Sequence, residues 1–110
     1  MIRQLTAQEA QALIESGQID LVDVREVPEF ATGHLAGARH VSLGRLRQNV
    51  RAALPRDKVI FVCAAGTRSN MAAQLALAAG LHEVYSLAGG TRGWVKAGFS
   101  LVRASQQATG

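Results

Sequence analysis

The sequence contains one cysteine, two prolines and few aromatic residues. A single cysteine makes no internal disulfide and no thiolate metal cluster, so we expect a reduced thiol and no metal. Apolar runs are all far shorter than the roughly 20 residues that span a bilayer. Residues 1–5 also lack the apolar core of a secretory signal. We therefore expect a cytoplasmic protein without a membrane partner.

The chain is 110 residues long and 48% hydrophobic, which is an ordinary globular composition. A chain of this length forms a single core, not two. We predict one domain over residues 1–104, followed by a flexible polar tail over residues 105–110. A monomer is the expected state of such a compact domain.

Positive charge is in moderate excess, with 12 Lys and Arg against eight Asp and Glu. Arg45, Arg47 and Arg51 fall on the polar face of a predicted helix, where a solvated surface explains them. No basic stripe with stacking aromatics and no nucleic-acid reading motif is present. The charge suits small anionic substrates, and we expect no nucleic-acid partner.

The single cysteine, Cys63, directly follows the apolar run Val59–Val62 and precedes a predicted helix over Met71–Ala79. A buried cysteine that only packs is one interpretation. The other is catalytic, because free loop N–H groups and the positive end of a helix lower the pKa of a thiol. Glycine within the loop permits a tight anion-binding turn. The candidate catalytic residue is Cys63, and the candidate substrate-binding loop is Ala64, Ala65, Gly66, Thr67, Arg68 and Ser69.

Short apolar runs alternate with amphipathic stretches along the whole chain. Strands are predicted at residues 19–24, 39–41, 59–62 and 84–87. Helices are predicted at residues 6–16, 28–30, 44–54, 71–79 and 91–97. This alternation predicts an α/β fold around a mostly parallel sheet, with the ligand at the carboxyl ends of the strands. Cys63 lies at such an end.

Five segments occur in an order that resembles the rhodanese sulfurtransferase family. They are Asp23-Val24-Arg25-Glu26, Glu29-Phe30, Gly33-His34-Leu35 with Gly37-Ala38, Cys63-x-x-Gly66-x-Arg68-Ser69, and Gly89-Gly90-x-x-Gly93-Trp94. The resemblance runs from Thr6 to Val102. It implies a rhodanese-like, five-stranded parallel sheet with helices on both faces, and Cys63 as the nucleophile that carries sulfur.

Such a thiolate attacks the outer sulfur of a donor such as thiosulfate, and a cysteine persulfide remains until cyanide or a thiol removes the sulfur. No cofactor is needed. The partners expected are a small anionic donor, a thiol or cyanide acceptor, and a sulfur-accepting protein. Arg68 has two open roles, either capturing the donor or bonding the loop carbonyls.

Three other functions share these residues. Cysteine-dependent phosphatases and arsenate reductases place five residues between Cys and Arg, whereas four stand between Cys63 and Arg68 here. No aspartate is assignable as the acid that phosphatases often need. A non-catalytic binding module is disfavoured by the retained cysteine. A persulfide carrier that serves a protein partner would use the same residues on another substrate.

Several further residues are assigned supporting roles. Asp23 and Arg25 follow a strand, and an internal ion pair or a hydrogen-bonded brace that supports the nearby loop is the expected role. His34 is interpreted as a loop brace, and Phe30 and Trp94 as core anchors. The pair Gly89-Gly90 is interpreted as a turn at the rim of the site, where the missing side chains keep access open.

Overall fold

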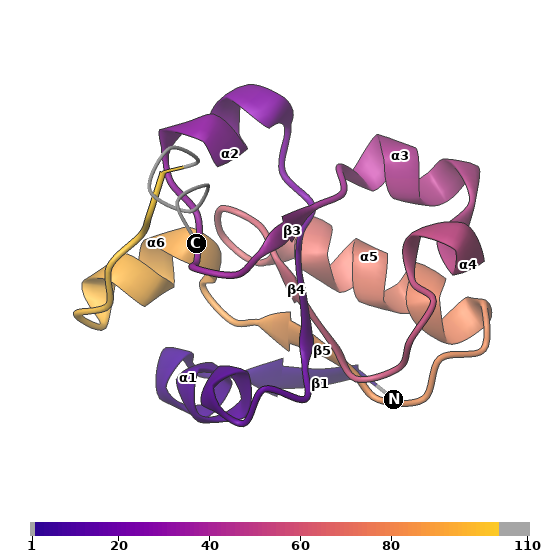
Figure 1. Cartoon of the computed structure of the whole chain (residues 1–110), viewed down its shortest axis with the longest axis horizontal. Coiled ribbons are helices and arrows are strands. Elements are labelled where there is room, and N and C mark those ends of the chain that lie inside the picture. The colour runs from indigo at the N-terminus through magenta and orange to yellow at the C-terminus, as the bar shows by residue number, and fades with distance from the viewer. Residues whose placement is uncertain (1, 104–110) are drawn as a thin grey trace.

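The computed structural model describes residues 2–103, and the predicted tail at 105–110 lies outside this range. Five strands form one sheet in the order β1-β5-β4-β2-β3, and every neighbouring pair is parallel. The strands are β1 (Ile2–Leu5), β2 (Asp20–Asp23), β3 (Arg39–His40), β4 (Val59–Val62) and β5 (Val84–Leu87). The predicted α/β sheet is thus confirmed, and Figure 1 shows its strands crossing the middle of the molecule.

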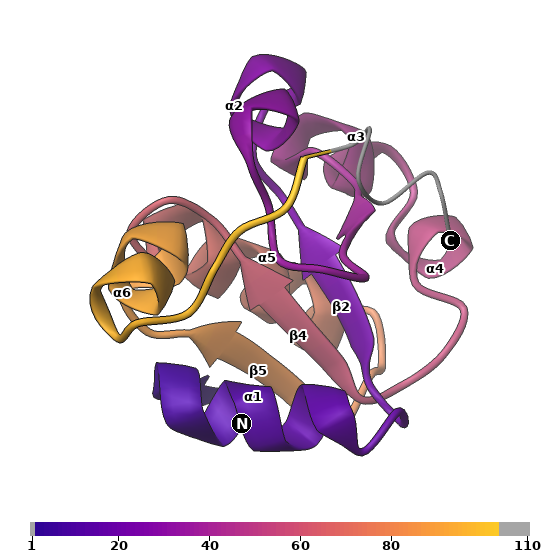
Figure 2. The ribbon, with the colours of Figure 1, turned by 60° about the vertical axis from the view of Figure 1, so that its left-hand side comes forward.

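Helices cover both faces of the sheet, as Figures 1 and 2 show. They are α1 (Ala7–Glu15), α2 (Val27–Thr32), α3 (Leu43–Gln48), α4 (Val50–Ala53), α5 (Thr67–Ala78) and α6 (Gly90–Lys96). α3, α4 and α5 pack on one face, and α1 and α6 on the other. No helix of residues 2–103 is both long and apolar enough to cross a membrane.

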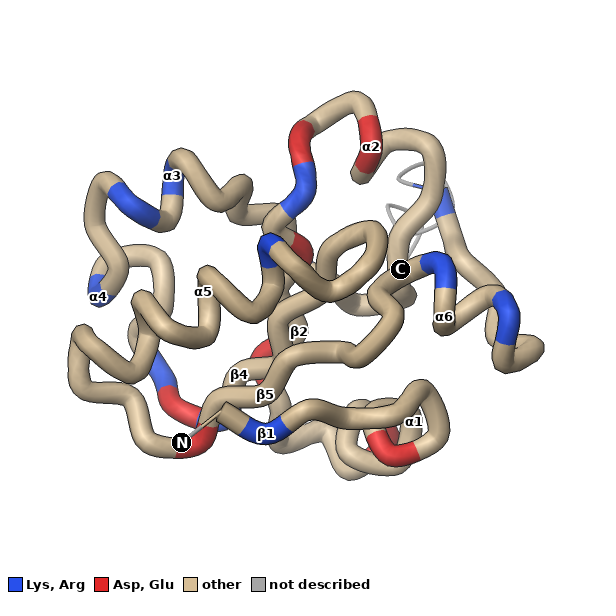
Figure 3. Tube along the Cα trace, turned by 180° about the vertical axis from the view of Figure 1, so that it is seen from behind, with Lys and Arg blue, Asp and Glu red and all other residues tan. Residues whose placement is uncertain are grey.

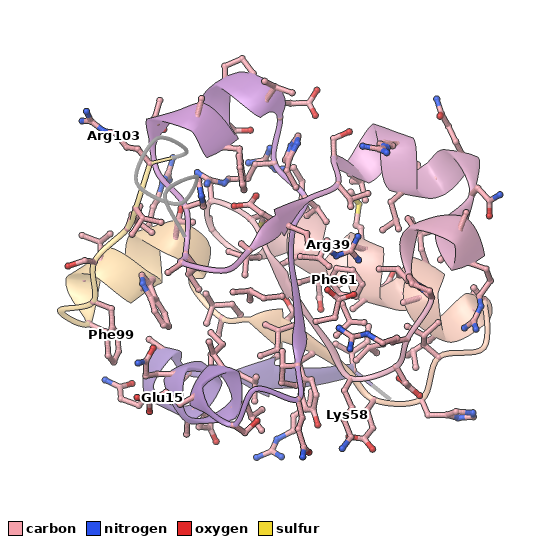
Figure 4. All side chains as sticks on the ribbon, viewed as in Figure 1. Glu15, Arg39, Lys58, Phe61, Phe99 and Arg103 are labelled. Atoms are coloured by element: carbon pink, nitrogen blue, oxygen red, sulfur yellow. The ribbon has the colours of Figure 1, made fainter. Side chains whose placement is uncertain are left out.

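Central strand β4 divides the core by alternation. Val59 and Phe61 pack with the helices of the α5 side, and Ile60 and Val62 pack with those of the α1 side. All four are fully buried, which is why this strand is continuously apolar and not alternating. Figure 4 labels Phe61 in the region between the sheet and α5. The strand therefore holds the residue that follows it, Cys63, on a rigid base.

Two elements away from the cysteine differ from the sequence prediction. β1 was missed because it is a short edge strand with two exposed polar residues, Arg3 and Gln4, and has little hydrophobic pattern. The helix predicted at 44–54 is two short helices, since Asn49 is extended and its side chain accepts a hydrogen bond from the N–H of Ala52. Asparagine caps a helix in this way better than it continues one.

Candidate active site

Cys63 lies immediately after β4, at the carboxyl edge of the sheet, with 1% of its surface exposed. The backbone N–H of Gly66 donates a hydrogen bond to its sulfur over 3.0 Å. The thiol contacts the hydroxyl of Ser69 at 3.5 Å, and that hydroxyl is 2.7 Å from the hydroxyl of Ser86. Backbone and hydroxyl groups therefore form a small polar cradle around the sulfur.

This cradle lowers the pKa of the Cys63 thiol below its ordinary value. Burial is the largest single influence and raises the pKa, because it penalises the charged sulfur. The Ser69 hydroxyl and the N–H groups of Ser69, Gly66 and Ala65 lower the pKa and together outweigh burial. Hydrogen bonding to the charged form thus favours a thiolate, which is the reactive form of cysteine.

Helix α5 begins at Thr67, so the predicted start at Met71 was wrong. Gly66 stands before the first turn with φ near +112°, a conformation that favours glycine. The loop is therefore residues 63–66, and Thr67, Arg68 and Ser69 belong to the first helical turn. The apolar pattern begins only at Met71, so it gave no sign of this turn. First-turn N–H groups have no partner within a helix and remain available to the sulfur.

The carbonyl groups of the loop are bound by the N-terminus of α6. The N–H of Thr91 donates to the carbonyl of Cys63 over 2.8 Å, and the N–H of Arg92 to that of Ala64 over 3.2 Å. This approach requires Gly90, because a Cβ there would lie 2.3 Å from the Cys63 carbonyl oxygen. For Gly90 the expectation of open access was wrong, since this glycine is buried and permits close backbone packing. Gly89, the other glycine of the pair, is exposed.

Arg68 forms a bidentate ion pair with Glu29 of α2. Its Nη1 donates to one carboxylate oxygen over 2.6 Å, and its Nη2 to the other over 2.9 Å. The Arg68 guanidinium and then the N–H of Glu26 lower the pKa of Glu29 to about 2. The expected bonding of Arg68 to loop carbonyls is not seen within residues 2–103, where its guanidinium pairs with Glu29 instead. Its capture of an anionic donor stays a prediction.

Asp23 and Arg25 form the internal ion pair that the sequence predicted. The Arg25 guanidinium donates to Asp23 at 2.8 to 3.1 Å and to the carbonyl of Gly33 at 2.6 Å, and both side chains are almost wholly buried. His40 Nε2 lies 2.6 Å from the carbonyl of Arg25. The pair therefore joins the end of β2 to the segment after α2, and so holds the helix that carries Glu29.

The other residues singled out from the sequence are packing elements. The ring of His34 stacks on Phe30 with centroids 3.8 Å apart, and its backbone N–H donates to Val102. Trp94 is buried and its indole N–H donates to the carbonyl of Ser100. These contacts agree with the predicted roles of brace and core anchor. Within the described chain, no group of three or more His, Cys, Asp or Glu forms a candidate metal site.

A groove of about 440 Å³ opens beside the loop of residues 63–66, which we call the sulfur loop. Its walls come from β1, the sulfur loop, α5 and the turn that follows β5. The lining residues are Gln4, Ala65, Gly66, Thr67, Asn70, Met71, Gln74, Ala88 and Gly89. A second cavity of about 340 Å³ lies against β3, α3 and α4 and includes none of the loop residues, so it is separate from the cysteine.

Two residues of this site, Glu29 and Ser86, have no function in the sequence prediction. Glu29 was read as part of a motif and given no function, although an acidic residue in the first turn of a predicted helix was visible. Ser86 is a polar residue inside the apolar strand Val84–Leu87, and a buried hydroxyl needs a partner. That exception to the pattern was the available signal for the second hydroxyl of the cradle.

Residues 6–97 match the family described as Rhodanese-like domain. The chain is 38% identical over 92 residues to the thiosulfate sulfurtransferase GlpE of Pseudomonas fluorescens, with 84% of each protein covered.

Solved structures give the same result. A rhodanese-related protein of Thermoplasma volcanium superposes with a TM-score of 0.81 at 29% identity, covering 91% of this chain and 97% of that one. A thiosulfate sulfurtransferase of Pseudomonas aeruginosa superposes with a TM-score of 0.82 at 33% identity, covering 93% of this chain and 20% of that one. The similarity thus spans the sheet, the loop and the helices of the site.

Proposed function

Since the chain belongs to the rhodanese-like domain family, we propose that it is a sulfurtransferase that carries a sulfane sulfur on Cys63. The observation that carries the proposal is the Gly66 N–H bound to the cysteine sulfur at 3.0 Å in a cradle that lowers the thiol pKa. The family's relatives named thiosulfate sulfurtransferase support thiosulfate, or a similar anion, as the donor.

In the first half-reaction the Cys63 thiolate attacks the outer sulfur of thiosulfate. A sulfur–sulfur bond forms at Sγ, the bond to the sulfonate group breaks, and its electron pair leaves with sulfite. No proton moves, because nucleophile and leaving group are both anions. The loop and first-turn N–H groups stabilise the thiolate before the step and the terminal sulfur of the persulfide after it.

In the second half-reaction an acceptor nucleophile attacks that terminal sulfur. With cyanide, a carbon–sulfur bond forms, the persulfide bond breaks, and its electron pair returns to Cys63 as a thiolate while thiocyanate leaves. A thiolate acceptor becomes a persulfide in the same way. The site needs no general base, which is consistent with a cysteine whose neighbours are backbone and hydroxyl groups.

Phosphatase chemistry suits this site less well. A phosphoryl group carries three outer oxygens, whereas the cradle lies between Cys63 and a helix that starts four residues later. The Arg68 guanidinium, which would bind such a group, is paired with Glu29. The short loop and the neutralised arginine therefore favour a single sulfur atom over a phosphate.

The direct test is mass spectrometry after incubation with thiosulfate. We expect one added sulfur on the peptide that contains Cys63, its loss on treatment with cyanide, and matching release of thiocyanate. Cys63→Ser should show neither product. Gln8→Ala serves as the control that should keep both products, because Gln8 is an exposed residue of α1 and contributes nothing to the cradle.

Absence of both the adduct and thiocyanate in the wild-type protein would exclude the enzymatic proposal and favour a binding module. Hydrolysis of a generic phosphate ester that depends on Cys63 would favour a phosphatase. A stable adduct with slow cyanide turnover and rapid transfer to a protein would favour a carrier.

A further inference from the structure

The segment of residues 30–56 contains five arginines and no Asp or Glu. It includes β3, α3 and α4, and in the rear view of Figure 3 the traces of α3 and α4 carry blue segments and no red one. Of its arginines, only Arg39 forms an ion pair within residues 2–103. The other four are exposed and no carboxylate neutralises them there, so this region attracts anionic ligands.

The cavity of about 340 Å³ against β3, α3 and α4 lies within this segment, and we call it the arginine cavity. Its polar lining comes from Arg39, His40, Arg45, Gln48 and Asn49, and no Asp or Glu lines it. Sites for small molecules have volumes of roughly 300–1,000 Å³. The arginine cavity therefore has room for a compact ligand that is larger than a single inorganic anion.

The guanidinium and amide groups that line the arginine cavity retain N–H donors without a partner. Asp20 accepts from Nε and Nη2 of Arg39, at 2.9 and 2.8 Å, which fixes the plane of that guanidinium. The side-chain oxygen of Asn49 accepts a backbone hydrogen bond, which leaves its NH₂ group as a donor. Within residues 2–103, Nη1 of Arg39, Nδ2 of Asn49 and the side-chain nitrogens of Arg45 and Gln48 make no hydrogen bond. The cavity is thus rich in donors and positively charged.

These donors come from different elements: Arg39 from β3, Arg45 and Gln48 from α3, and Asn49 from the junction before α4. One guanidinium satisfies a planar carboxylate, whereas a phosphate group accepts hydrogen bonds from several directions. We propose that the arginine cavity binds a small phosphate monoester, with the phosphate on Arg45 and the donors beside it. The inference does not rest on the proposed function, because no residue of the sulfur loop lines this cavity.

The test is an NMR titration of the full chain with ribose 5-phosphate at about 0.1 M salt, where distant charges are screened. Ribose, which lacks the phosphate, and succinate, a dianion without phosphate, are the comparison ligands. We expect saturable shifts of the backbone amides of Arg45, Gln48 and Asn49 with ribose 5-phosphate, and binding of both comparison ligands weaker by about tenfold or more. No shift at these amides, shifts confined to the sulfur loop, or equal binding of succinate would overturn the proposal.

Arg45→Gln and Arg47→Gln form a matched pair, since both arginines are exposed on α3 and only Arg45 lines the cavity. Arg45→Gln should weaken the binding of ribose 5-phosphate about tenfold, the effect of losing charged hydrogen bonds. Arg47→Gln should weaken it less than about twofold, because only a screened charge is lost. Equal losses in the two variants would show attraction to the general positive charge and would overturn the site.

A second pair of variants separates charge from shape. Ala52 lines the arginine cavity and is exposed, so both replacements are compatible with folding. Ala52→Asp places a carboxylate beside the bound phosphate and should abolish binding, whereas Ala52→Asn, which has the same shape, should keep it. Equal affinity of these two variants for ribose 5-phosphate would place the ligand outside the cavity and contradict the proposal.

Discussion

Removing one partner of an ion pair beside a binding site usually weakens binding. For the Glu29–Arg68 pair we predict the opposite effect on the affinity for thiosulfate. If Arg68 is held by Glu29 and the donor is bound by backbone N–H groups, Glu29→Gln should release the guanidinium for anions. The variant should then bind thiosulfate more tightly than the wild-type protein. A role for Glu29 in folding alone predicts weaker binding.

The magnitude follows from the exposure of the pair. Hydrogen bonds to charged groups contribute roughly 1.5–3 kcal/mol. Arg68 and Glu29 are 32% and 36% exposed, so water screens the interaction and about half that value is appropriate. A gain of about 0.75–1.5 kcal/mol corresponds to anion binding about four- to twelvefold tighter.

Two assays measure this effect. The first is the KM for thiosulfate in the thiocyanate assay. In Glu29→Gln this KM should fall and should depend more strongly on salt than in the wild-type protein. The second is protection of Cys63 from iodoacetamide by sulfate, which requires no turnover. Glu26→Gln is the matched control, because it removes a neighbouring carboxylate that does not contact Arg68. Adding Arg68→Gln to Glu29→Gln should abolish the gain.

The pH dependence of stability gives a further check. The folded-state pKa of Glu29 is lowered to about 2, so its stabilisation is complete above the ordinary value of 4.5 and is lost as the pH falls toward 2. Wild type and Glu29→Gln should differ by about 1 kcal/mol near neutral pH and converge near pH 2 in urea unfolding. A thiosulfate KM that rises in Glu29→Gln, with the pair's stability effect intact, would refute the reasoning.

Three other predictions concern the cradle and its supports. Gly90→Ala places a Cβ 2.3 Å from the Cys63 carbonyl oxygen and should lower the Tm by at least about 10 °C, whereas Gly44→Ala, with open space around it, should raise the Tm slightly. Ser69→Ala should move the midpoint of the pH profile for Cys63 alkylation upward, since its hydroxyl lowers the thiol pKa; an unchanged midpoint would remove that hydroxyl from the cradle. Asp23→Asn should cost about 3–5 kcal/mol in denaturant unfolding, because it leaves a buried guanidinium without its charge partner.

The sequence predicted the parts of the fold that depend on a strong local pattern. The three inner strands, β2, β4 and β5, lie in short runs rich in buried apolar residues, and Thr6 with Glu9 forms the capping box that begins α1. β1 was not predicted, because this edge strand is held by its pairing to β5 and has little hydrophobic pattern. The start of α5 was predicted four residues too late, because its first turn is polar and only Gly66, with a positive φ, marks the boundary.

The chemistry of the site was predictable at the cysteine but not around it. Cys63 stands at the end of an apolar strand, a position that is visible in one segment. The partner of Arg68 lies 39 residues away in sequence, and the partner of Ser69 lies 17 residues away. Such pairs are brought together by the parallel order of the sheet, which places the carboxyl ends of β2, β4 and β5 side by side.

The hydrogen bonds from α6 to the loop carbonyls give the loop two chemically different sides. Because Thr91 and Arg92 hold the carbonyl oxygens of Cys63 and Ala64, these peptide groups cannot rotate to present oxygen to the sulfur. The loop therefore presents an N–H donor to the sulfur, while the carbonyl acceptors of Cys63 and Ala64 are bound by α6. Adding a sulfur atom to Cys63 or removing it should therefore leave the backbone of this loop unchanged. The thiolate and persulfide states should have superimposable main chains.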